Sequence, residues 1–124
     1  MNTKIASYSS VLALCSVLSL AAPTIVPQLE DAYAESENTK QKIVAVFGAD
    51  WCGACKTLHK DLMDKPEVID NYIYVYINID ERSDLKKNYN INKVPDIMVL
   101  DKNVEVKRRV GYKNLTEFKK WLEK

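Results

Sequence analysis

The sequence contains few of the histidine and cysteine residues that form structural zinc sites. Its 124 residues include one histidine and three cysteines, and only Cys52 and Cys55 lie close together. A structural zinc site needs four ligands, which a second pair of Cys or His residues usually supplies. The remaining candidates are His59, one helical turn beyond Cys55, and the distant Cys15. We therefore predict no metal site and no cofactor, with zinc bound at the cysteine pair as the alternative.

The chain also lacks a strong excess of charge of either sign. Its 18 basic and 17 acidic residues fall to 17 and 15 once Lys4, Glu30 and Asp31 in the first 34 residues are set aside. A net charge near +2 on about 90 residues argues against nucleic acid as the main partner. The composition therefore points to a protein that does not bind nucleic acid.

The first 34 residues have the features of an export signal. Lys4 supplies a positive charge, and residues 11–22 (VLALCSVLSLAA) form an apolar stretch of the length that secretory signals have. Small residues at both ends of Ala32-Tyr33-Ala34 predict cleavage before Glu35. We therefore expect a signal peptide over residues 1–34.

An uncleaved membrane anchor is the alternative interpretation of this segment. No charged residue occurs between Lys4 and Glu30, which leaves room for an apolar span over about residues 5–26. Both interpretations place the rest of the chain outside the cytoplasm, in the periplasm or another extracytoplasmic compartment. If the signal is removed, only Cys52 and Cys55 remain, which leaves no structural disulfide.

One small domain follows the N-terminal segment. Residues 35–42 (ESENTKQK) are polar and unpatterned, which predicts a linker. Residues 43–124 have a dense hydrophobic pattern without an internal repeat, enough for one modest core. The expected elements are strands at 43–47, 72–80, 97–100 and 104–110, and helices at 52–63, from 83 or 84 to 89, and from 114. This β-α-β-α-β-β-α order predicts a three-layer α/β fold with a four-stranded mixed sheet between helices.

Several conspicuous side chains are expected to have structural roles. Tyr72, Tyr74 and Tyr76 alternate with isoleucine and valine, so we expect them to pack under a helix. His59 is expected to be an exposed helix residue. The run Lys107-Arg108-Arg109 is expected to be solvated charge on an edge strand.

The strongest functional signal is a strand followed by Cys-x-x-Cys and a helix. Three residues of separation bring Cys52 and Cys55 within bonding reach when Cys52 caps the helix and Cys55 lies in its first turn. Unpaired N–H groups and the macrodipole at a helix N-terminus stabilise a thiolate, which is the attacking species in thiol–disulfide exchange. The order therefore predicts a redox-active dithiol/disulfide pair.

Residues 47–56 (FGADWCGACK), followed by Val94-Pro95-Asp96 before a strand, resemble the thioredoxin superfamily over about residues 42–124. Within it the chain looks most like small exported thioredoxin-like domains, including the C-terminal domain of the transmembrane disulfide-reducing proteins. Residues 65–68 (KPEV) and 110–112 (VGY) also fit that group.

The resemblance implies roles for five residues. Cys52 would attack and Cys55 would resolve the mixed disulfide. Pro95 would follow a cis peptide bond and face the cysteines, which leaves the backbone of Val94 free to pair with an extended substrate segment. Trp51 would pack beside the disulfide and form part of the contact surface.

The sequence departs from thioredoxin proper at several positions. Val46 stands where thioredoxin has a buried Asp, Tyr76 where it has the partner lysine, and Ala54 where it has Pro. The leading strand and helix of thioredoxin are expected to be absent, because residues 35–42 are too short to supply them.

These observations predict an exported thiol–disulfide oxidoreductase that reduces protein disulfides. The dipeptide Gly53-Ala54 contains no histidine, so the Cys52 thiolate lacks a stabilisation found in strong oxidases. The expected partners are disulfide-containing proteins and a membrane or exported thiol electron donor, and we expect a monomer. The alternatives are a disulfide oxidase or isomerase, and a binding module of the same fold with no redox role.

Overall fold

The computed structural model describes residues 22–124, so Lys4, Cys15 and almost all of the predicted apolar signal lie outside the described residues. The helices are α2 (Leu29–Thr39), α3 (Gly53–Asp64), α4 (Ser83–Asn88) and α5 (Leu115–Glu123), with a 3-10 turn η1 (Pro66–Ile69). The strands are β1 (Thr24–Val26), β2 (Lys42–Gly48), β3 (Tyr72–Asn78), β4 (Asp96–Asp101) and β5 (Val104–Val110).

The strands form one mixed sheet in the order β1-β3-β2-β4-β5. Strands β1, β3 and β2 are parallel, while β4 is antiparallel to β2 and β5 is antiparallel to β4. The three-layer α/β fold is confirmed, and the sheet has five strands rather than four. The additional strand is β1, which pairs only through Thr24, Ile25 and Val26 and is too short to show an alternating pattern.

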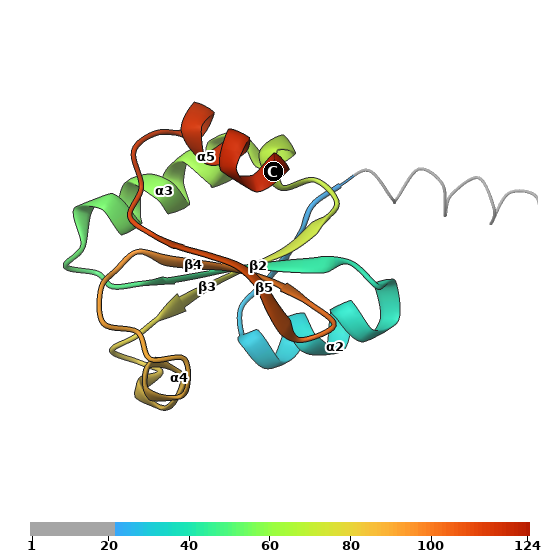
Figure 1. Ribbon diagram of the computed structural model, residues 1–124, viewed down its shortest axis with the longest axis horizontal. Coiled ribbons are helices and arrows are strands. Elements are labelled where there is room, and N and C mark those ends of the chain that lie inside the picture. Colours follow the sequence, from blue (N-terminus) through green and yellow to red (C-terminus); the bar gives the residue numbers. More distant parts are fainter. Residues whose placement is uncertain (1–21) are drawn as a thin grey trace, which may run out of the picture.

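The two faces of the sheet carry separate cores. Helices α2 and α4 cover the face that we call the α2 face, and α3 and α5 cover the opposite, α3 face (Figure 1). Alternate residues of β2 point to the two sides: Phe47 and Ala45 to the α2 face, Val46 and Val44 to the α3 face. The tyrosines of β3 lie on the α3 face, as the alternation predicts.

The predicted linker at residues 35–42 is wrong, and so is the expectation that a leading strand and helix are absent. Helix α2 continues to Thr39 and β2 begins at Lys42. Only Leu29, Ala32 and Ser36 of α2 are buried, so its inner face shows almost no apolar pattern. The Ser36 hydroxyl donates to the carbonyl oxygen of Gln41 (2.7 Å) and fastens the end of the helix.

The folded domain therefore begins well before Ile43. Arg82, which follows β3, donates to the side chains of Gln28 (2.9 Å) and Glu30 (3.0 Å) at the start of α2. The hydroxyls of Tyr33 and Tyr89 are hydrogen-bonded to each other and join α2 to the end of α4. Within residues 22–124, no helix is both long and apolar enough to cross a bilayer.

Candidate active site

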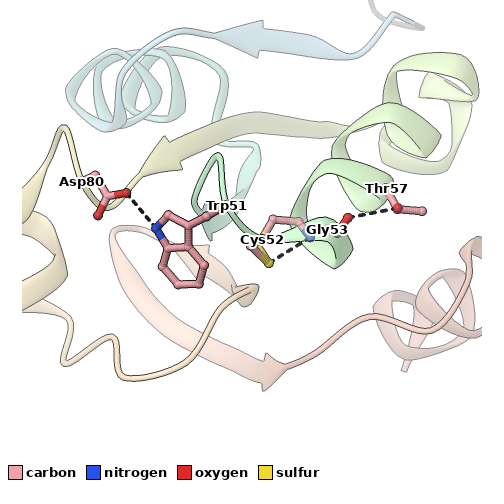
Figure 2. Close-up of a disulfide and its surroundings, with 6 residues drawn as sticks. Trp51, Cys52, Gly53, Thr57 and Asp80 are labelled. Atoms are coloured by element: carbon pink, nitrogen blue, oxygen red, sulfur yellow. Dashed lines mark hydrogen bonds between the residues drawn. A yellow bond between two sulfur atoms is a disulfide. The ribbon is translucent and has the colours of Figure 1, made fainter.

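Cys52 and Cys55 form a disulfide at the point where β2 has ended and α3 begins (Figure 2). Cys52 is the N-cap of α3: its backbone is extended, and its sulfur accepts the N–H of Cys55 at 3.2 Å. The predicted placement of Cys52 at a helix start is confirmed. No acidic side chain lies in the first turn of α3, so nothing there opposes the field of the helix N-terminus.

The two cysteines differ in their access to solvent. Cys52 retains 9% of its surface and Cys55 is fully buried in the core of the α2 face. Of the two residues, only Cys52 therefore offers surface to an incoming group. This arrangement provides an accessible sulfur and a protected one within a single disulfide.

Trp51 is the most exposed large apolar residue near the disulfide, with 68% of its surface accessible. Its indole N–H donates to the Asp80 carboxylate at 3.0 Å, as Figure 2 shows. Asp50 is held in turn by the side-chain amide of Asn78 (3.3 Å). Asp50 and Trp51, which precede the disulfide, are thus held by Asn78 at the end of β3 and by Asp80 just after it. The sequence did not predict these two contacts. The available signal was that β3 runs parallel to β2, so the ends of the two strands meet at the same edge of the sheet.

Val94 and Pro95 lie in the segment that leads into β4. The Val94–Pro95 peptide bond is cis, as the resemblance implies. Val94 packs against the cluster that contains Cys52 and Cys55, and the Pro95 carbonyl accepts the N–H of Gly111 at 2.8 Å. The fold therefore places Val94 against the same core as Cys52 and Cys55, although about 40 residues of chain separate them.

The strand beneath the disulfide carries no ionisable group where thioredoxin has its buried Asp. Val46 is fully buried and pairs in register with Tyr76. The Tyr76 ring lies against Gly48 and leaves no room there for a Cβ atom. Burial, together with the negative charge of Asp50, raises the pKa of Tyr76. The hydroxyl therefore stays protonated at neutral pH and cannot act as a base.

The expectation that His59 is an exposed helix residue is wrong. Its Nδ1 lies 2.8 Å from the hydroxyl oxygen of buried Tyr74, and its ring centroid lies 4.8 Å from that of Tyr76. Burial lowers the pKa of His59, which keeps the imidazole neutral near pH 7. The position of His59 on α3 did not reveal this burial, because the tyrosines that cover the imidazole come from β3. In residues 22–124 no three or more His, Cys, Asp or Glu side chains gather to hold a metal.

The fold and the Cys-x-x-Cys disulfide are those of the thioredoxin-like oxidoreductases. Residues 29–124 match the Thioredoxin-like domain family, and the chain belongs to that family. It is 31% identical to thioredoxin of Mycoplasma genitalium over 85 residues, which are 68% of this chain and 79% of that protein.

Solved thioredoxin structures have the same fold. A thioredoxin h from poplar superposes with a TM-score of 0.71 at 24% identity, covering 82% of this chain and 94% of the poplar chain. A mutant thioredoxin from Halobacterium salinarum gives a TM-score of 0.66 at 26% identity, covering 82% of this chain and 88% of that chain. The region that matches the family begins at Leu29, the first residue of α2, so this helix belongs to the domain.

Proposed function

We propose that this chain is an exported reductase of protein disulfides. The observation that carries the proposal is the unequal access to the two sulfurs at the start of α3, with Cys52 reachable and Cys55 buried. A nucleophile must meet its substrate, whereas a resolving thiol only has to meet the mixed disulfide formed beside it. The absence of histidine between the cysteines favours reduction over strong oxidation.

The reaction starts from the reduced protein. The Cys52 thiolate attacks one sulfur of a substrate disulfide; the substrate S–S bond breaks, and its second sulfur leaves as a thiolate that takes up a proton. Cys55 then loses its proton and attacks the Cys52 sulfur. This step releases the first substrate sulfur as a thiolate and forms the Cys52–Cys55 disulfide seen in the structure. Two electrons pass to the substrate, and an external thiol donor must restore the dithiol.

Substrate recognition is assigned to the surface around Cys52. The exposed indole of Trp51 offers apolar contact area, and the backbone at Val94 offers groups for pairing with an extended polypeptide. Along the chain, Trp51 precedes the two cysteines and Val94 follows them.

Insulin reduction by the purified domain tests the proposal. We expect Cys52→Ser to abolish turnover and to form no mixed disulfide, because the accessible sulfur is gone. Cys55→Ser should accumulate a mixed disulfide through Cys52, detectable by mass spectrometry. Trapping through Cys55 in the Cys52→Ser variant would overturn the assignment, and a wild-type domain that oxidises dithiols but does not reduce insulin would favour the oxidase alternative.

Export is proposed from the charge and apolar stretch of the N-terminal segment, with a revised boundary. Cleavage before Glu35 would remove β1 and the first half of α2, including buried Leu29 and Ala32. We therefore propose that any cleavage lies before Thr24. Mass spectrometry of the secreted or membrane-bound protein tests this: an N-terminus at Glu35 contradicts the revised boundary, and a full-length protein in the cytoplasm contradicts export.

A further inference from the structure

Arg108 is exposed on the edge strand β5, as the sequence suggested, and its guanidinium also binds two other segments of the chain. Its Nε donates to Asp96 Oδ1 (3.0 Å) and its Nη2 to Asp96 Oδ2 (2.7 Å). Nη2 also donates to the carbonyl oxygens of Tyr89 (3.0 Å) and Asn90 (3.3 Å). A single guanidinium on β5 thus holds the start of β4 and the end of α4 together.

The partner carboxylate is buried and directly follows the substrate-binding residues. Asp96 is 2% exposed and is joined in sequence to Pro95. A buried carboxylate is stable only when it is paired, and the planar guanidinium fork supplies two parallel hydrogen bonds to it. Lysine cannot reproduce this contact, because its charge is a single point.

The groups held by Arg108 stand at the two ends of one loop. Tyr89 immediately precedes residues 90–96, Asn90 begins them and Asp96 ends them, so Val94 and Pro95 lie between the two points that Arg108 holds. The N–H of Gly111 fixes the Pro95 carbonyl from the end of β5 (2.8 Å), so the same part of the chain holds the loop at two points. Loop shape therefore depends on β5 and on the residue that follows it.

We propose that Arg108 is a positioning residue that fixes the loop of residues 90–96 in the shape in which the Val94 backbone pairs with a polypeptide substrate. The proposal rests on the proposed reductase function. Arg108 controls the binding of extended polypeptides and leaves the reactivity of the Cys52 sulfur unchanged, because it touches the loop and not the motif.

The neighbouring arginine provides a matched control. Arg109 also forms an ion pair, with Glu117 at 2.7 Å, and its guanidinium lies 5.5 Å from the centroid of the Trp121 ring. These contacts are on the α5 side of β5, away from residues 90–96. Arg109→Gln therefore removes an equal charge and an ion pair from the same strand without releasing the loop.

The test compares Arg108→Lys and the double variant Asp96→Asn/Arg108→Gln with Arg109→Gln. The double variant leaves no unpaired buried charge, which keeps it foldable if the single variant is not. The substrates are insulin and the small disulfide 5,5′-dithiobis(2-nitrobenzoate). In Arg108→Lys and in the double variant we expect KM for insulin to rise about fivefold to tenfold, the equivalent of about one lost hydrogen bond. The rate with the small disulfide should be unchanged, and Arg109→Gln should leave both rates unchanged.

Hydrogen exchange over residues 89–96, followed by mass spectrometry, gives a second measurement that does not depend on activity. Exchange should accelerate in the double variant and not in Arg109→Gln. A folded double variant with unchanged KM for insulin, or with equal losses for both substrates, would overturn the proposal. If the wild type reduces neither substrate, the reductase function fails, and unchanged exchange over 89–96 would then overturn the role of Arg108 by itself.

Discussion

The two faces of the sheet are built from the same strands but hold different kinds of side chain. The α2 face holds mostly aliphatic side chains, together with both cysteines, Ser36 and a few aromatic rings, among them Tyr33 and Tyr89 with their paired hydroxyls. The α3 face contains a buried tyrosine, Tyr74, bonded to the half-buried His59. It also carries the Tyr112 hydroxyl bonded to Asp61. Both faces therefore hold polar pairs, but of different kinds. On the α2 face Asp96, which alternates with Met98 and Leu100 along β4, is paired with Arg108, whereas the α3 face holds the neutral His59.

The disulfide stands at the edge between these two faces. Both cysteines pack with the core of the α2 face, yet the helix that carries them runs over the α3 face. Changes to the aliphatic residues of the α2 face should therefore act mainly through stability. Changes on the α3 face near the motif can also act on the proton that Cys55 must lose.

The largest expected effect comes from removing the N-terminal part of the α2 face. A chain starting at Glu35 lacks β1 and half of α2, whereas a chain starting at Pro23 keeps both. We expect the shorter chain to lose more than about 3 kcal/mol of unfolding free energy, the cost of deleting a large buried side chain such as Leu29, or to fail to fold. Urea unfolding of both chains measures the difference; equal stabilities would mean that α2 is dispensable.

The second prediction places a carboxylate on the α3 face by Val46→Asp, with Val44→Asp as control. Both valines are fully buried on β2, and Val46 is the nearer to the cysteines in sequence. Each variant should lose about 2–4 kcal/mol of unfolding free energy at neutral pH, because burial disfavours the charged carboxylate. The loss should shrink towards low pH, since burial raises the pKa of the new carboxyl group and protonation makes it neutral.

Only Val46→Asp should speed the resolution of the mixed disulfide at pH 7, by about tenfold, because a base near Cys55 can accept its proton. Stopped-flow measurement of substrate release gives this rate. Equal acceleration in Val44→Asp, or none in a folded Val46→Asp protein, would show that the missing carboxylate does not limit resolution.

The smallest expected effect concerns His59, the sole histidine in the chain. Burial lowers the pKa of His59 in the folded protein, so the unfolded chain binds a proton more readily. Its contribution to stability is therefore fully present above about pH 6.5, the ordinary histidine value, and is lost as the pH falls below it. His59→Gln should flatten the decline in thermal stability between about pH 6.5 and 5.

Tyr74→Phe is the companion variant, because it keeps the histidine and removes its hydrogen-bond partner. Burial is the cause of the lowered pKa, so this variant should retain the decline below about pH 6.5. If thermal stability falls just as steeply in His59→Gln, the decline below about pH 6.5 is caused by carboxyl groups and not by His59.

Most of the fold was predictable because its elements have clear periodic patterns. The alternation in β3 placed its isoleucines and tyrosines on opposite faces, and Asn114 accepts the N–H of Glu117 (2.9 Å) at the start of α5, where the last helix was expected to begin. The start of α3 at the cysteines was predictable from the motif itself. The β1–α2 unit was not, because α2 buries only one large residue, Leu29, and two small ones.

The sequence by itself determined the spacing of Cys52 and Cys55, their place at a helix start, and the apolar strand before them. These are local properties, set by covalent distance and by backbone groups within one turn of helix. Only the tertiary structure decided that Arg108 pairs with Asp96, that Tyr74 bonds to His59, and that Asp80 holds Trp51. Each of these contacts joins residues 12 to 29 positions apart, and their charges and hydroxyls carry no periodic signal. Pairing across a sheet depends on strand order and register, which the packing of the whole domain sets.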